Sequence, residues 1–248
     1  MNHFVTRTIP EQALPDWKAL QEIQICDNNE PLEPMSLSSS IKVYPAYHKM
    51  QIRHAISECF VRASVFERLI EAEKLLPTGI HLVILDAWRP FPVQQYLFDT
   101  LMNLMEHANP ELSPQQCNDK ARNLVSPPST DPKAPSPHLT GGSVDVTLCD
   151  QHGRLLNMGT LFDEASDDSW TAALERPALS KALQLAQQNR RLLYHAMTNA
   201  GFSNLASEWW HYDYGNQLWA LATQQSCAFF GATRPSGIER LWQQQLQR

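Results

Sequence analysis

The sequence lacks the features that mark several large classes of protein. Its 20 Lys and Arg residues are scattered and the net charge is −6, so no basic surface indicates a nucleic-acid partner. No apolar run is long enough to span a bilayer. The N-terminus shows neither a signal-peptide core nor a small-residue cleavage site. We therefore expect a cytoplasmic protein that binds neither membrane nor nucleic acid.

Cysteine is also too sparse for a disulfide framework. The chain has five cysteines, an odd number, and none forms a CxxC pair. In a reducing compartment such thiols are expected to be buried or incidental. They stand at Cys26, Cys59, Cys117, Cys149 and Cys227.

The composition is that of an ordinary globular chain, with 43% hydrophobic and 19% charged residues. A length of 248 residues suffices for one domain with a full core, and we expect a single domain over residues 1–248. Residues 1–40 are rich in proline and serine and are expected to form an irregular covering segment. Residues 216–248 are expected to form a helical extension at the C-terminus.

Hydrophobic periodicity separates helices from strands along the chain. Helices are expected over His54–Leu76, Pro92–Leu104, Pro177–Ala200 and Asn216–Phe230. Strands are expected over His81–Ala87, Ser143–Leu148 and Glu208–Tyr214. The proline-rich connection over residues 107–137 is expected to lack regular structure near its end. This pattern predicts an α+β fold, in which helices flank a small antiparallel sheet that carries the functional site.

The first candidate segment is residues 136–145, SPHLTGGSVD. His138 and Asp145 offer an imidazole and a carboxylate, which are both ligands for zinc. The two glycines between them allow a sharp turn, so a loop histidine can approach a strand aspartate. Taken alone, the segment fits a structural loop histidine and a turn-capping aspartate better than a metal site.

The second candidate is Glu208-Trp209-Trp210-His211. Its histidine can bind a metal while its glutamate acts as general base on an attacking water. In an extended strand these two side chains would face opposite ways, so a turn or bulge is needed to bring them together. A buried aromatic strand with a satisfied histidine explains the motif equally well.

The third candidate is Arg89, which directly follows an expected buried strand. Its forked donors suit a carboxylate or a developing oxyanion. The plainer interpretation is a salt bridge to Asp86. Together, the three segments supply three metal ligands, a base and a cation, which is the set that a metallopeptidase needs.

These segments resemble the D-alanyl-D-alanine dipeptidases, zinc peptidases linked to vancomycin resistance. The matching motifs appear in the family's order at residues 86–90, 136–145, 158–163 and 208–211. The resemblance implies an α+β domain that binds one zinc ion and hydrolyses the dipeptide D-alanyl-D-alanine. It implies that the metal ligands are His138, Asp145 and His211. The implied catalytic residues are Glu208 and Arg89. The implied substrate contacts are Ser136 and Asp163.

In that family pattern, Glu208 takes a proton from zinc-bound water and passes it to the leaving amine, and Arg89 stabilises the oxyanion. Asp163 would hold the free amino terminus of the substrate by charge. Two alternatives stay open. The chain could be a D,D-carboxypeptidase or peptidoglycan endopeptidase of the same superfamily, or a zinc-binding module without catalysis. The presence of Glu208 favours an enzyme.

Overall fold

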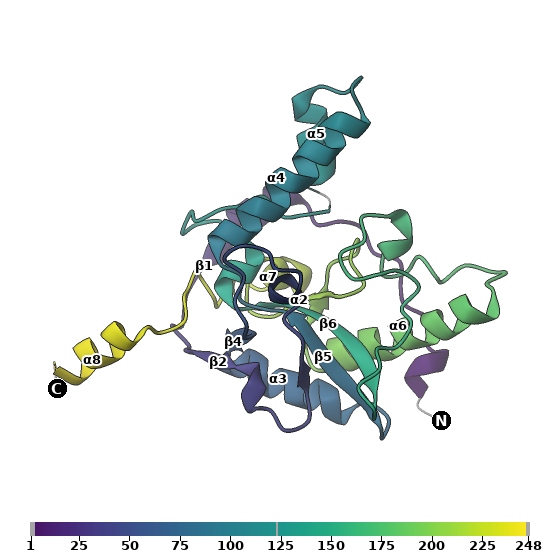
Figure 1. Ribbon diagram of the computed structural model, residues 1–248, viewed down its shortest axis with the longest axis horizontal. Coiled ribbons are helices and arrows are strands. Elements are labelled where there is room, and N and C mark those ends of the chain that lie inside the picture. The colour runs from purple at the N-terminus through teal and green to yellow at the C-terminus, as the bar shows by residue number, and fades with distance from the viewer. Residues whose placement is uncertain (1–2, 123, 247–248) are drawn as a thin grey trace.

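The computed structural model describes residues 3–122 and 124–246, and its centre is a five-stranded sheet (Figure 1). The strand order is β3-β5-β6-β8-β7; β3 is parallel to β5, and the remaining three neighbouring pairs are antiparallel. Two small sheets pair β1 with β9 and β2 with β4. The strands are β1 Gln24–Ile25, β2 Leu32–Pro34, β3 Lys42–Val43, β4 Phe60–Arg62, β5 Ile80–Asp86, β6 Ser143–Asp150, β7 Ser203–Asn204, β8 His211–Asp213 and β9 Cys227–Ala228.

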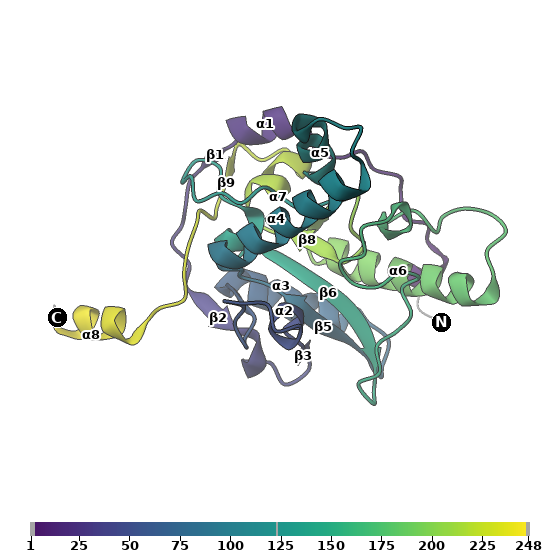
Figure 2. The same ribbon diagram turned by 45° about the horizontal axis from the view of Figure 1, so that its top comes forward.

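Helices surround this sheet and confirm the α+β expectation. They are α1 Trp17–Glu22, α2 Ala46–Lys49, α3 Ala63–Lys74, α4 Phe91–Ala108, α5 Pro114–Ala121, α6 Lys181–Asn199, α7 Gln217–Ala222 and α8 Ile238–Leu246. Short 3-10 turns occur at His3–Thr6, Met35–Leu37, Pro137–Thr140 and Asp167–Ser169. Figure 1 shows α4 and α5 projecting from the body, and Figures 1 and 2 both show α8 standing apart from it.

Strand β6 separates the hydrophobic core from the functional face. Val144, Val146 and Leu148 are fully buried in the cluster that also contains side chains of α3 and α6. Side chains alternate along a strand, so Asp145 and Thr147 face the opposite side of the sheet. Burying each aliphatic side chain contributes roughly 1.5–3 kcal/mol, which anchors the strand that carries the aspartate.

Strand register brings three polar residues into one row across the sheet. Asp86 on β5 pairs with Asp145 on β6, and Asp145 pairs with His211 on β8. Directly opposed residues share a face, so the three side chains lie next to one another. The β5–β6 register shifts between Ile84 and Asp86. Such bulges re-aim side chains at the ends of strands.

Several expected boundaries differ from those of the structure. The helix expected from His54 begins only at Ala63, because residues 60–62 pair with β2 as strand β4. The helix expected over Asn216–Phe230 ends at Ala222, because the chain then returns to pair with β1. Periodicity within one segment does not reveal such a distant strand partner.

Two further segments add to the expected pattern or shorten it. Helix α5, which the sequence did not indicate, lies in the first half of the 107–137 connection, before its proline-rich end, and a reciprocal capping box between Ser113 and Gln116 begins it. The expected strand over Glu208–Tyr214 is only three residues long in β8, because Glu208 to Trp210 form a turn before it. No helix among the described residues has the length and apolarity needed to cross a membrane.

Candidate active site

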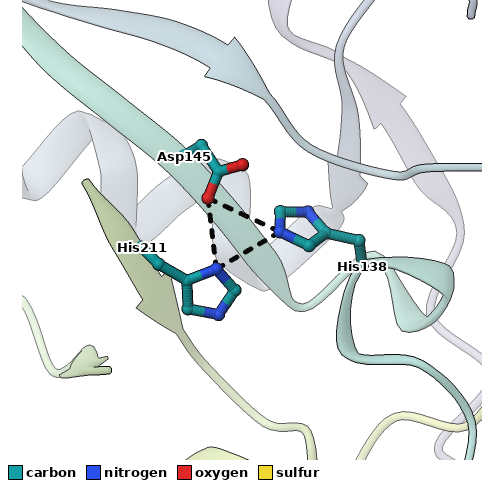
Figure 3. A group of neighbouring side chains, drawn as sticks. All are labelled: His138, Asp145 and His211. Atoms are coloured by element: carbon teal, nitrogen blue, oxygen red, sulfur yellow. Dashed lines mark hydrogen bonds and ion pairs between the residues drawn. The ribbon is translucent and has the colours of Figure 1, made fainter. Parts of the chain in front are cut away.

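Three buried side chains converge on one point at the end of the central strands (Figure 3). Asp145 comes from β6 and His211 from β8, its cross-strand neighbour. His138 comes from the 3-10 turn before β6, where Gly141 at φ +72° ends the turn in the left-handed region that favours glycine. Their ligand atoms all lie within 4.8 Å of one another. The fold thus brings together the three metal ligands expected from the sequence.

Hydrogen bonds orient both imidazoles so that one nitrogen of each faces the third ligand. His138 Nδ1 lies 2.7 Å from the Ala87 carbonyl oxygen, an acceptor that requires a proton on this nitrogen. His211 Nε2 lies 3.1 Å from both carboxylate oxygens of Asp213. This leaves His138 Nε2 and His211 Nδ1 to face Asp145, where each could bind a metal in its deprotonated form. Metal-binding histidines are typically held in this way through their second nitrogen.

The spacing of these atoms fits a tetrahedral zinc site. His138 Nε2 and His211 Nδ1 are 3.2 Å apart, and they lie 3.5 Å and 3.1 Å from Asp145 Oδ1. Zinc bonds of about 2.0–2.1 Å at tetrahedral angles place neighbouring ligand atoms roughly 3.3–3.4 Å apart. Two imidazoles and one carboxylate also leave a fourth position for water or substrate, which is typical of catalytic zinc sites.

The charge around these ligands is strongly negative. Carboxylates at Asp86, Asp145, Asp163, Glu208 and Asp213 surround the site. The one guanidinium among these contacts belongs to Arg89, so five carboxyl groups face a single arginine before any metal is counted. Burying so much uncompensated charge is costly, and a divalent cation reduces that cost.

Protonation of the metal-free site reflects the same charge. Burial alone would raise the pKa of Asp145, but the charge and hydrogen bonds of His138 and His211 outweigh it and hold this pKa below its usual range. Burial alone would lower the pKa of His211, yet Asp213 and Asp145 raise it well above its ordinary value. In the metal-free chain, the imidazole of His211 therefore carries a proton where a metal would otherwise stand.

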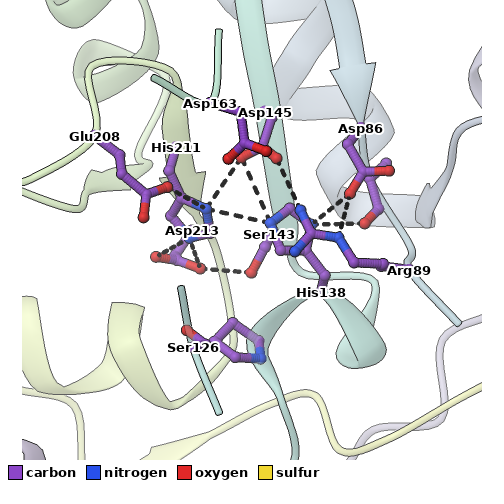
Figure 4. Close-up of polar contacts among 12 residues, drawn as sticks. Asp86, Arg89, Ser126, His138, Ser143, Asp145, Asp163, Glu208, His211 and Asp213 are labelled. Atoms are coloured by element: carbon purple, nitrogen blue, oxygen red, sulfur yellow. Dashed lines mark hydrogen bonds and ion pairs between the residues drawn. The ribbon is translucent and has the colours of Figure 1, made fainter. Parts of the chain in front are cut away.

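Arg89 lies beside the ligands and is held on three sides (Figure 4). Its Nε donates to Asp86 at 2.8 Å, one Nη donates to Gln94 at 2.8 Å, and the other donates to Asp145 at 3.1 Å. The salt bridge to Asp86 considered from the sequence therefore exists. A guanidinium has five donor hydrogens, so two remain for another acceptor. The guanidinium carbon of Arg89 also lies 4.9 Å from the centre of the Tyr47 ring. Arg89 lines a small cavity that borders His138, Asp145 and His211.

Glu208 reaches the site through the turn that the sequence motif required. The His211 amide donates to the Glu208 carbonyl at 3.3 Å, and the Glu208 carboxylate lies 3.8 Å from His211 Nδ1. Burial raises the pKa of Glu208 to about 8, with the negative charges of Asp145 and Asp163 adding to the effect. A carboxyl group whose pKa lies near neutrality can both accept and return a proton.

The two expected substrate contacts occupy different environments. Asp163 lines the cavity, and its carboxylate accepts a hydrogen bond from Tyr47 Oη at 3.1 Å. Ser136 instead lines a neighbouring pocket. Its hydroxyl donates to the Pro127 carbonyl at 3.0 Å and accepts from the Ser129 amide at 2.7 Å. In this structure Ser136 therefore holds the loop beside the site, and its contact with substrate stays a prediction.

Sequence reasoning missed two polar residues that the structure adds to the site. Asp213 orients His211, and its position two residues later on the same strand was an available signal, since i and i+2 share a face. Tyr47 bonds to Asp163 from α2, over a hundred residues away in the chain, and no local pattern marks it.

Comparison with known proteins places the sequence in a family. The model of the D-ala-D-ala dipeptidase family matches residues 46–230, about three quarters of the chain. The chain belongs to the D-alanyl-D-alanine dipeptidase family. The D-alanyl-D-alanine dipeptidase of Synechocystis sp. is 31% identical over 215 residues, which cover 80% of this chain and 87% of that protein. The D-alanyl-D-alanine dipeptidase of Escherichia coli K12 is 35% identical over 136 residues, or 55% and 56% of the two chains.

Solved structures show more distant likeness. VanYB in complex with D-alanine-D-alanine has a TM-score of 0.43 and 16% identity, covering 70% of this chain and 82% of that one. A VanY D,D-pentapeptidase variant in complex with Zn(II) has a TM-score of 0.42 and 14% identity, with the same coverage.

Membership in the family confirms the main expectations from the sequence. The chain is a zinc-dependent metallopeptidase of the D-alanyl-D-alanine dipeptidase type. The roles of individual residues, the cytoplasmic location and the extent of the domain stay predictions.

Proposed function

We propose that this chain hydrolyses free D-alanyl-D-alanine in the cavity beside His138, Asp145 and His211, which hold the zinc ion. One observation carries this assignment: three ligand atoms at tetrahedral spacing, two of them on imidazoles whose other nitrogens are already hydrogen bonded. When bound, zinc supplies Lewis-acid polarisation and lowers the pKa of a water molecule towards neutrality.

The chain's own groups perform the proton transfers. Glu208 accepts a proton from the attacking water and returns it to the nitrogen of the leaving D-alanine, so that one water and one dipeptide yield two amino acids. Its carboxylate is largely shielded from solvent, with 14% of the side chain exposed, and it adjoins the ligand cluster. Arg89 offers its two remaining donor hydrogens to the oxygen that becomes negative as the amide carbon turns tetrahedral.

Recognition of the dipeptide's free amine is assigned to Asp163 and Tyr47. The Asp163 carboxylate supplies the negative charge that an ammonium group requires, and the Tyr47 hydroxyl fixes the orientation of that carboxylate at 3.1 Å. An acylated amine has no positive charge to pair with Asp163. This end of the site therefore favours a free dipeptide over a longer peptide chain.

The cavity beside the candidate metal ligands is nearly closed. Its volume is about 20 Å³, and apolar side chains of Leu97, Leu124 and Val125 line it together with the polar groups. That space holds on the order of one water molecule. A dipeptide is much larger, so the cavity must open before substrate binds.

The direct test offers two substrates to the zinc-loaded protein. D-alanyl-D-alanine and an N-acylated peptide ending in the same two residues are incubated separately, and released D-alanine is measured. We expect release from the dipeptide and little from the longer peptide. Release only from the longer peptide would identify a carboxypeptidase, and release from neither would exclude both activities.

A further inference from the structure

Arg190 on helix α6 is a buried cation that no part of the chemistry above uses. Its side chain is 1% exposed, and within the described part of the chain it makes no ion pair. The guanidinium instead donates to three backbone carbonyls, those of Met158 at 2.6 Å, Asp168 at 2.8 Å and Trp170 at 2.8 Å. Burial lowers the pKa of Arg190 to about 10, so it remains charged at neutral pH.

These carbonyls stand at the two ends of one loop, residues 158–170. One guanidinium therefore closes the base of the loop, as its planar fork of five donors allows and a lysine ammonium does not. Asp163 lies near the middle of this loop at φ +62°, a backbone conformation that is unusual for a residue other than glycine. Such a conformation persists only where the surroundings hold it.

A second set of contacts joins the loop to the segment that carries Glu208. The Thr160 hydroxyl accepts from Trp209 Nε1 at 2.8 Å and from Arg190 Nη2 at 3.4 Å. The Trp209 amide donates to the Ser169 carbonyl at 3.1 Å. The loop is thus attached on one side to α6 and on the other to the residue next to the proposed base.

We propose that Arg190 is a positioning residue that fixes the 158–170 loop, with help from Thr160, so that Asp163 meets the substrate's amine and makes a free amino group a requirement for binding. This inference rests on the proposed function, because it assumes that Asp163 receives the ammonium group. Arg190 touches neither substrate nor metal, and its effect reaches the reaction through the placement of Asp163.

The test separates amine recognition from general damage to the enzyme. Arg190→Lys and Thr160→Val are compared with wild type on D-alanyl-D-alanine and on its N-acetyl derivative. The control is Arg191→Met, which removes the neighbouring arginine of the same helix. The Arg191 side chain bonds to Glu175 and to the Val5 carbonyl rather than to the loop. Zinc content and circular dichroism are measured for each protein.

We expect both loop variants to raise KM for the free dipeptide about 10- to 100-fold with kcat nearly unchanged, since a small misplacement of a binding group costs that much. Activity on the N-acetyl dipeptide, already low, should change less than about threefold. Arg191→Met should behave as wild type. Equal losses on both substrates, or no loss on either, would overturn the inference. If Arg190→Lys does not fold, Thr160→Val decides.

A binding measurement separates failure of this inference from failure of the proposed function. Calorimetry measures how tightly D-alanyl-D-alanine and its N-acetyl derivative bind to Glu208→Ala, which lacks the proposed base. The same two ligands are then measured with the double variant Glu208→Ala/Thr160→Val. Tighter binding of the free dipeptide that disappears in the double variant supports the inference even if wild type shows no turnover. No preference for the free amine in Glu208→Ala overturns it, even if wild type is an active dipeptidase.

Discussion

Replacing Asp213 by asparagine should weaken zinc binding while leaving the fold intact. Asp213 is 1% exposed, and its carboxylate accepts from His211 Nε2, Ser143 Oγ and Asn216 Nδ2, the last two at 2.6 Å. Asparagine has the same size, but it is neutral and has only one acceptor oxygen. Ser143 and Asn216 both donate to Oδ1, whereas His211 Nε2 contacts both oxygens, so the amide nitrogen that replaces Oδ2 faces His211, which already donates.

The size of the effect follows from the contact that is lost. A hydrogen bond to a charged group contributes about 1.5–3 kcal/mol, and a neutral one about 0.5–1.5 kcal/mol. The difference of roughly 1–1.5 kcal/mol corresponds to about a tenfold weaker zinc affinity. This estimate lies at the lower end of the 10- to 100-fold losses typical when the partner of a metal-binding histidine is removed.

Zinc affinity is measured by competition with a chromophoric chelator at fixed pH. Asp150→Asn serves as the matched control, since this partly exposed carboxylate on the same sheet bonds only to the backbone amides of His152 and Arg154 among the described residues. We expect the control to keep the zinc affinity of wild type. A folded Asp213→Asn protein that binds zinc as tightly as wild type would refute the role given to Asp213.

Three further expectations concern the proposed chemistry. Glu208→Ala should lower kcat by about 10²–10⁴-fold with one zinc still bound; loss of the metal, seen by elemental analysis, would mean that Glu208 is a ligand instead. Arg89→Lys should lower kcat by about 10²–10³-fold in steady-state assays, because an ammonium lacks the fork that spans Asp86, Asp145 and the oxyanion; an unchanged kcat would contradict this. The raised pKa of His211 means that the metal-free chain holds a proton there at neutral pH and loses it only as pH rises. Zinc should therefore bind more tightly as pH rises and release about one proton, measured by calorimetry in buffers of different ionisation enthalpy; release of none would contradict the assignment.

The proposed metal ligands could be named from the sequence because each stands in a short motif with its own chemistry. His138 and Asp145 share a loop–strand segment, and Glu208 and His211 share a turn, so local spacing placed each pair. Their convergence depends on β6 pairing with β8, which joins residues 66 positions apart. Spacing does not predict such a pairing, and the motif resemblance supplied it instead.

Other features depend on contacts between segments that show no pattern of their own. Strand β4 forms because β2 lies beside it, although hydrophobic spacing predicted helix there. Tyr47 enters the site because α2 packs against β5. In both cases tertiary contacts override or add to local propensity, which limits any prediction from one segment at a time.

The placement of Asp163 on a loop, with the metal ligands held by the sheet, divides the protein into parts that can evolve separately. Asp145 and His211 are fixed by strand pairing, so substitutions around Asp163 in the 158–170 loop need not disturb these two residues. Loops tolerate such change far better than paired strands do. A new substrate end group could therefore be accommodated by rebuilding the 158–170 loop alone, with the hydrolytic chemistry inherited unchanged.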